Sequence, residues 1–214
     1  MNRPLIISDC DEVLLHMVVH FKEWLETSQG VNFHLEGHNF AEALRWQTSG
    51  ELLQPADIWK MLGRFFDTEM DSQQPIKGAV EAINTLAEVA DVVILTNLVD
   101  ERRNQRAAQL AAIGIHAEVY TNQGPKGPAL QKIIAEHAPS KALFIDDLAQ
   151  HHASVAETAP QVTRLHLCGE PMIAHAIDCA HKAGHAHSRI DRWDEALPWI
   201  LQRLEEPAHV EEIG

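Results

Sequence analysis

The 214-residue chain is poor in cysteine and has no long apolar run. Its three cysteines, Cys10, Cys168 and Cys179, form neither a metal-binding spacing nor an even disulfide framework, so we expect reduced thiols. No apolar run is long enough to span a bilayer. The first residues turn acidic within nine positions, which is not typical of a secretory signal. These absences predict a cytoplasmic protein with no membrane partner.

Basic residues are also scarce, with 17 Lys and Arg against 31 Asp and Glu, a net charge of −14. Binding to nucleic acid requires a basic face that neutralises phosphates, so this balance predicts no nucleic-acid partner. A small anionic ligand remains compatible, because it needs only a local positive pocket. Hydrophobic residues make up 45 % of the chain, which excludes a disordered chain and allows a sizeable core.

Five short apolar runs have the length and composition of buried strands, at residues 4–8, 91–95, 116–120, 142–145 and 162–167. Helical patterns separate the later runs, at residues 80–90, 102–113, 128–137 and 149–159. This alternation predicts an α/β fold with a doubly wound, Rossmann-like parallel sheet. Ligands of such sheets bind at the carboxyl ends of the strands.

The stretch between the first two predicted strands is too long for one crossover helix. Apolar residues fall at helical spacing in three parts of it, near residues 14–25, 40–46 and 56–66. We therefore interpret residues 15–75 as an inserted helical cap, with a return hinge at 73–75. Residues 1–14 and 76–214 form the predicted core, which ends in a helix over 193–204.

Polar residues follow four of the five predicted strands. They are Asp9 and Asp11 after the first strand, Thr96 and Asn97 after the second, Lys126 after the third, and Asp146 and Asp147 after the fourth. Carboxylates beside a single lysine form a hard oxygen cage that suits Mg²⁺. A lysine and a hydroxyl suit the oxygens of a phosphate. One carboxylate can attack phosphorus while a second acid protonates the leaving oxygen.

The ordered motifs DCDEVL, VILTN, the lysine of GPKGPAL, and FIDDL resemble those of the haloacid dehalogenase-like superfamily of phosphohydrolases. The resemblance covers residues 1–14 and roughly 76–167, and the insertion is similar to the small helical cap of that family. Each motif alone is weak, whereas the ordered set is specific.

The resemblance implies a role for each residue. Asp9 would be the nucleophile and a Mg²⁺ ligand. Asp11 would be the general acid/base and would give its backbone carbonyl to the metal, while Lys126 would neutralise the phosphate and orient Asp9. Thr96 would hold a phosphoryl oxygen, and Asn97 would support it through its backbone. Asp146 would bind the metal directly, and Asp147 would bind it directly or through water.

The family resemblance predicts a Mg²⁺-dependent phosphatase that hydrolyses a small phosphate ester through an aspartyl-phosphate, as a monomer or homodimer. A phosphomutase, a dehalogenase and a phosphate-ester-binding protein without turnover remain alternatives. Dehalogenases of this family attack carbon and lack an acid at the position of Asp11, so its presence favours phosphate. Glu12 departs from the family pattern, because many members have glycine there.

Histidine clusters give weaker signals. His181, His185 and His187 favour a solvated surface over a metal site, because Gly184 weakens the helix that zinc-binding spacing would need. His151 and His152 follow the predicted metal-site acids, and we expect them on the exposed face of a short helix, with the rim of the active site as the alternative.

Basic residues in two further regions are weaker candidates. Arg102, Arg103 and Arg106 follow the second motif, and we expect them on a solvated helix face. In the insertion, His16 and Arg45 are the candidate contacts to the leaving group of the substrate.

Overall fold

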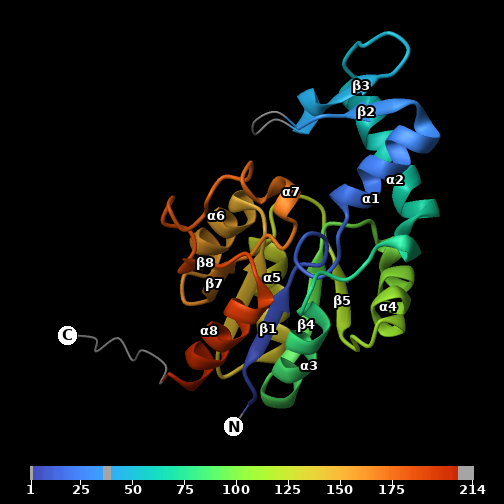
Figure 1. Cartoon of the computed structure of the whole chain (residues 1–214). Coiled ribbons are helices and arrows are strands. Elements are labelled where there is room, and N and C mark those ends of the chain that lie inside the picture. The colour runs from blue at the N-terminus through green and yellow to red at the C-terminus, as the bar shows by residue number, and fades with distance from the viewer. Residues whose placement is uncertain (1, 36–39, 207–214) are drawn as a thin grey trace.

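A six-stranded parallel sheet forms the centre of the computed structural model, which describes residues 2–35 and 40–206 (Figure 1). The strands are β1 (Leu5–Ser8), β4 (Asp91–Thr96), β5 (Glu118–Thr121), β6 (Ala142–Asp146), β7 (Thr163–His166) and β8 (Ser188–Arg189). Their order in the sheet is β5-β4-β1-β6-β7-β8. The predicted doubly wound α/β fold is confirmed, and of the strands of this sheet the sequence pattern missed only β8, which is two residues long.

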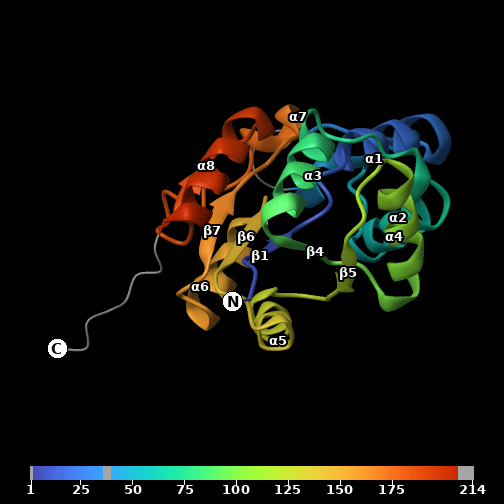
Figure 2. The same ribbon diagram turned by 90° about the horizontal axis from the view of Figure 1, so that it is seen from below.

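Helices cover both faces of the sheet. They are α3 (Ala79–Val89), α4 (Arg103–Ala112), α5 (Gly127–His137), α6 (Ala149–Thr158), the short α7 (Pro171–Ala174) and α8 (Trp193–Glu205). Figure 2 shows α3 and α8 on one side of the sheet and α5 and α6 on the other. The longer helices lie within a few residues of the helical patterns in the sequence.

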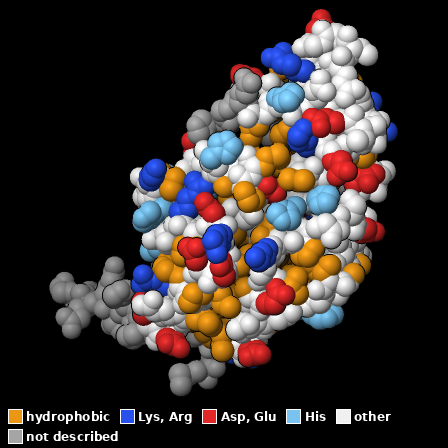
Figure 3. Space-filling view, viewed as in Figure 1, with side chains coloured by type: hydrophobic (Ala, Val, Ile, Leu, Met, Phe, Trp, Pro, Cys, Tyr) orange, Lys and Arg blue, Asp and Glu red, His pale blue; other side chains and the backbone are white. Residues whose placement is uncertain are grey.

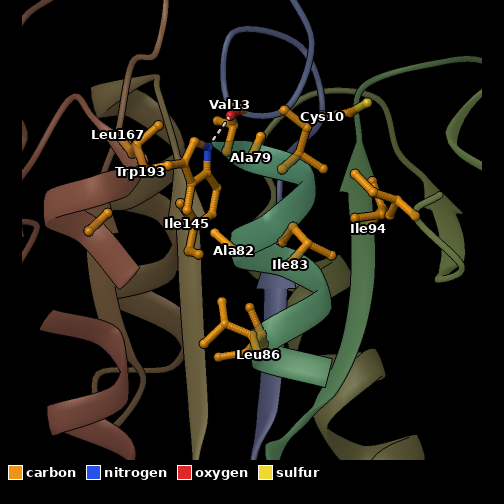
Figure 4. Close-up of a cluster of buried hydrophobic side chains, with 14 of the residues drawn as sticks. Cys10, Val13, Ala79, Ala82, Ile83, Leu86, Ile94, Ile145, Leu167 and Trp193 are labelled. Atoms are coloured by element: carbon orange, nitrogen blue, oxygen red, sulfur yellow. Dashed lines mark hydrogen bonds between the residues drawn. The ribbon is translucent and has the colours of Figure 1, made fainter. Parts of the chain in front are cut away.

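The core lies between the sheet and these two helical layers. Successive residues of a strand point to opposite faces, so Ile6 packs with α3 and α8 while Leu5 and Ile7 pack with α5 and α6. On the first face Trp193 fills the space between the two helices (Figure 4). Its indole N–H donates to the backbone oxygen of Val13 at 2.8 Å, which fixes the loop that follows β1.

The insertion between β1 and α3 contains strands as well as helices. Its elements are α1 (Val18–Trp24), a π-helical turn (Leu25–Gln29), β2 (Val31–Phe33), a 3₁₀ turn (Phe40–Ala43), β3 (Leu44–Trp46), α2 (Pro55–Thr68) and a second 3₁₀ turn (Met70–Ser72). The expected helix over residues 40–46 is therefore wrong in its second half. Leu44 is buried and Arg45 is exposed, which is the two-residue alternation of a strand. This strand, β3, pairs antiparallel with β2.

The insertion, called the cap below, has its own apolar cluster. Phe65 of α2 meets the edges of Phe21 and Trp24 of α1, with ring centroids 5.3 and 5.9 Å apart. The two chain segments that join cap and core run side by side. His16 N–H donates to Gln74 O at 2.9 Å, and Ile76 N–H donates to Leu14 O at 2.8 Å. The cap is thus attached through a paired double linker.

Among residues 2–35 and 40–206, no helix combines the length and the apolarity that crossing a bilayer requires.

Gly127, the first residue of α5, allows a close approach to α6. A Cβ at this position would lie 2.5 Å from the backbone oxygen of Ser154 and would collide with Thr158 Oγ1. We expect Gly127→Ala to lower the free energy of unfolding by about 2 kcal/mol, measured by chemical denaturation. Gly63→Ala in α2 is the matched control, because a Cβ there meets only the end of the Arg102 side chain, at 3.6 Å. It should be neutral or stabilising by up to about 1 kcal/mol. Equal effects of the two substitutions would contradict the close approach.

Candidate active site

The ends of three adjacent strands bring the predicted site residues together. β1 lies between β4 and β6, so Asp9 after β1 is flanked by Thr96 at the end of β4 and Asp146 at the end of β6. Asp9 N–H donates to Ile145 O at 2.8 Å, which continues the β1–β6 pairing into the site. The carboxyl edge of the sheet therefore gathers these groups, as parallel topology predicts.

Lys126 joins two of the carboxylates. It precedes α5, and its ammonium lies 2.8 Å from Asp9 Oδ1 and 2.7 Å from Asp146 Oδ2. The side chain is fully buried. Burial acts to lower the pKa of Lys126, but the charges of Asp146 and Asp9 outweigh it and raise the pKa above its ordinary value. Lys126 is therefore a permanent cation at the base of the site.

Asp9, Asp146 and Asp147 form a compact carboxylate cluster, with one ligand oxygen of each within 4.8 Å of the others. Burial raises the pKa of Asp9 to about 7, and Asp146 adds to this against the opposing charge of Lys126. Burial, and then the charges of Asp146 and Asp9, raise the pKa of Asp147 well above its usual range. Burial acts to raise the pKa of Asp146 as well, but the charge of Lys126 outweighs burial and lowers the pKa of Asp146 below its ordinary value.

This cluster fits a hard divalent cation. Three buried carboxylates lie beside a single lysine, which pairs with two of them, so their negative charge exceeds the positive charge beside them. Oxygen ligands in such a set suit Mg²⁺ better than a soft metal. Burial, and then the charge of the neighbouring carboxylates, raises the pKa values of Asp9 and Asp147, and a bound cation would oppose this rise.

Thr96 and Asn97 lie at the neighbouring strand end. Thr96 is buried, and its backbone oxygen accepts from Asn122 N–H at 2.9 Å. The amide of Asn97 donates to Gly124 O at 3.0 Å, and its oxygen accepts from the Asn122 side chain at 2.9 Å. These bonds fix the loop that leads to Lys126.

Asp11 is held by a buried arginine that sequence reasoning missed. Arg106 Nη2 lies 3.0 Å from both oxygens of Asp11, and Gln73 Nε2 donates to Asp11 Oδ1 at 2.9 Å. Arg106 Nη1 donates to Gln73 Oε1 at 3.1 Å and to Gln109 Oε1 at 3.0 Å. Burial acts to lower the pKa of Arg106, but the charge of Asp11 outweighs burial and raises the pKa above its ordinary value.

The solvated position expected for Arg106 is wrong, because its side chain is fully buried. A signal was present in the sequence. Arg106 precedes Leu110 by four residues, which places it on the apolar stripe of α4. Gln73, in the predicted hinge, carried no comparable pattern.

Glu12 points into the protein and caps the first helix of the cap. Its Oε1 accepts from the backbone N–H groups of Met17 and Val18, at 3.0 and 2.6 Å. Its φ of +61° lies in the left-handed region, which glycine adopts more easily. Burial raises the pKa of Glu12 to about 8. Next to it, His16 Nδ1 lies 2.7 Å from Glu170 Oε2.

His151 and His152 are buried, so the expected exposed positions are wrong. They belong to the first turn of α6, which begins directly behind the Asp146–Asp147 pair and packs against the sheet. His152 Nε2 bonds to Asp146 O at 2.9 Å, and its ring stacks on His166 with centroids 5.4 Å apart. His151 lies at the cavity described below.

Other candidates make local structural contacts. Arg45 is exposed and donates to Gly50 O at 3.2 Å. Arg102 binds Asp67 of α2 at 2.8 Å and so ties the cap to the core. His181 Nδ1 bonds to Ala186 O at 3.0 Å, and His187 Nδ1 accepts from Arg164 N–H at 2.9 Å. No metal-ligand group of three includes these histidines in the part of the chain that the structure describes.

A cavity of about 730 Å³ opens above the carboxylates, between the cap and the core. Its core wall includes Asp9, Asp11, Thr96, Asn97 and Asp147. Its volume falls within the range of small-molecule sites. The space-filling view shows hydrophobic side chains at the surface where the cap, at the top, meets the core (Figure 3).

The fold resembles solved structures of haloacid dehalogenase-like hydrolases. One such hydrolase from Streptococcus pneumoniae superposes with a TM-score of 0.64 at 10% identity, covering 93% of this chain and 98% of that one. A predicted phosphoglycolate phosphatase from Haemophilus somnus gives 0.61 at 12% identity, covering 92% and 97%. A protein described as a β-phosphoglucomutase from Thermotoga maritima gives 0.60 at 13% identity, covering 93% and 99%. No protein-family model and no curated protein matches the sequence.

These likenesses define a class of fold. The chain has the haloacid dehalogenase-like fold over almost its whole length, as the four motifs predicted.

Arg106 provides a test of the buried network. Arg106→Met would leave polar atoms of Asp11, Gln73 and Gln109 unpaired, so we expect the free energy of unfolding to fall by about 3 kcal/mol in chemical denaturation. Arg103→Met, on the half-exposed side of the same helix, should change it by no more than about 0.5 kcal/mol. A similar small loss for both variants would show that the network adds little stability.

The raised pKa of buried Glu12 predicts that the stability of the fold depends on pH. Its folded pKa of about 8 lies above its unfolded value, so the native state holds this proton more tightly. The associated stability is complete below about pH 4 and is lost as the pH rises through 8. Glu12→Gln keeps an acceptor oxygen but removes the titration. We expect it to gain about 3 kcal/mol relative to the native chain between pH 5 and 8, measured by denaturation at each pH. Exposed Glu88→Gln is the control, and a pH-independent difference for Glu12→Gln would contradict the assignment.

Proposed function

We propose that the protein is a Mg²⁺-dependent phosphatase that hydrolyses a small phosphate ester through an aspartyl-phosphate on Asp9. One observation carries the proposal: Asp9, Lys126, Asp146 and Asp147 converge at the carboxyl edge of the sheet, with Asp11 facing the same cavity. The shared fold with proteins described as phosphatases and phosphomutases supports it.

Asp9 is suited to attack phosphorus. Its Oδ1 accepts from Cys10 N–H at 2.7 Å and pairs with Lys126, which fixes the orientation of the carboxylate. These contacts leave Oδ2 as the attacking oxygen. A new bond forms between Oδ2 and phosphorus, and the bond from phosphorus to the leaving oxygen breaks.

Asp11, whose side chain lines the cavity and pairs with Arg106, would move the protons. It gives a proton to the departing oxygen in the first step. In the second step it takes a proton from water, which attacks phosphorus and releases inorganic phosphate and free Asp9. Thr96 and the backbone of Asn97 would hold the phosphoryl oxygens, and both residues line the cavity.

The metal would be held by Asp9, Asp146 and Asp147, with the backbone carbonyl of Asp11. When bound, it supplies the positive charge that lets an anionic carboxylate approach an anionic phosphate. Lys126 contributes a fixed positive charge from below.

The test of the mechanism is hydrolysis of p-nitrophenyl phosphate with and without Mg²⁺. We expect metal-dependent turnover by the native chain and a loss of at least about a thousandfold for Asp9→Asn, because the amide is a poor nucleophile. Asp91→Asn is the matched control. This carboxylate lies at the start of β4, at the opposite edge of the sheet, and should leave the rate unchanged.

Three results would overturn the proposal. Full metal-dependent activity of Asp9→Asn would exclude the aspartyl-phosphate. Chloride release from a haloacid without added Mg²⁺, in place of phosphate release, would favour the dehalogenase alternative. Transfer of the phosphoryl group to an added sugar phosphate would identify a phosphomutase instead.

A further inference from the structure

The cap wall of the cavity is apolar along one side of α2. The side chains that line it recur at helical spacing and are Ile58, Trp59, Leu62 and Phe66. Trp59 is 72 % exposed, the most exposed large hydrophobic residue that the structure describes. A largely exposed aromatic side chain that lines a cavity contributes little to packing the cap, and it offers apolar area to a ligand.

The facing wall of the cavity is also apolar. Ile173 of α7 and Ile177 just after it lie opposite α2, and Met17 and Val18 extend the lining from the start of α1. The site of phosphoryl transfer lies at the core end of this cavity, since Asp9 and Thr96 also line it. A phosphate at Asp9 would therefore direct its leaving group between these walls.

The charges around the cavity are of one sign. Its described lining includes five acidic residues, Asp9, Asp11, Glu12, Asp147 and Asp178, and no lysine or arginine. The cations that contact the lining carboxylates are already paired: Lys126 with Asp9 and Asp146, and Arg106 with Asp11. A second anionic group on the substrate would find no lysine or arginine among these described lining residues.

We infer that the substrate is a phosphate monoester of an uncharged, mainly apolar alcohol, whose alkyl or aryl group lies between Trp59 and Ile177. This inference rests on the proposed function and adds the class of leaving group. It excludes substrates whose leaving group carries a carboxylate or a second phosphate. Apolar contact supplies the binding energy, and an anionic leaving group would lose its water without gaining a cationic partner.

The primary test is a panel of monoesters assayed with Mg²⁺. The panel contains ethyl, butyl, hexyl and phenyl phosphate, 2-phosphoglycolate and glucose 6-phosphate. Each methylene that becomes buried should raise kcat/KM roughly fourfold, so hexyl phosphate should exceed butyl phosphate by roughly 15-fold. We expect 2-phosphoglycolate to be at least about a hundredfold poorer than hexyl phosphate.

Substitutions at Trp59 test the wall without disturbing the core, because this side chain is exposed. Trp59→Ala should reduce kcat/KM for hexyl phosphate about tenfold and leave ethyl phosphate almost unchanged. Trp59→Lys should lower the rate with hexyl phosphate and raise the relative rate with 2-phosphoglycolate. Val89→Ala, at an exposed position at the end of α3, is the control and should change neither.

Binding of alkylphosphonates, which cannot be hydrolysed at the carbon–phosphorus bond, separates this inference from the proposed function. If calorimetry shows affinity rising with chain length while no ester is hydrolysed, the apolar site stands and the phosphatase proposal fails. If esters are hydrolysed with no gain from ethyl to hexyl phosphate, or with 2-phosphoglycolate as the best substrate, the phosphatase stands and this inference is overturned.

Discussion

The contact of Lys126 with Asp9 and Asp146 is the constraint on which the site depends. A fully buried ammonium is costly unless carboxylates surround it, so the ends of β1 and β6 and the start of α5 must meet at one point. Gly127 makes this possible by letting α5 approach α6 closely. The same contact leaves Asp147 without a cation of its own, which is why burial and its neighbours raise its pKa. The positive charge missing from the protein is the charge that a divalent metal would bring.

Much of this edge of the sheet could be predicted from the sequence. Short apolar runs mark parallel strands, and their carboxyl ends must lie together, so Asp9, Thr96 and Asp146 were expected to converge. Arg106 was assigned to solvent because a charged residue on a helix is usually exposed. Its burial follows from its partner Asp11, 95 residues earlier, which no local pattern reveals. The burial of His152 depends in the same way on the later strand that carries His166. The cap strands were missed because three-residue strands are too short to show their period.

The loop after β1 connects the candidate catalytic residues to the cap. Glu12 caps α1 through its carboxylate, and its neighbour Asp11 binds Gln73 in the returning segment. Both connections between cap and core therefore contact residues within three positions of Asp9. A movement of the cap that shifts Gln73 or the start of α1 changes the contacts of Asp11 directly. The strained backbone of Glu12 gains an explanation from this arrangement, because its side chain provides two hydrogen bonds that glycine lacks.

Under the proposed function, a protein with a net charge of −14 must still attract an anionic phosphate. The positive charge is concentrated at the base of the cavity, where Lys126, loop N–H groups and a bound metal would act together. The described residues that line the cavity above this base include no lysine or arginine. Long-range attraction is therefore weak, and binding energy must come from contact. Apolar walls supply such contact for an uncharged group, whereas a second anion would lose its water without gaining a partner. The same charge distribution thus favours one phosphate at the base of the cavity and an apolar group above it.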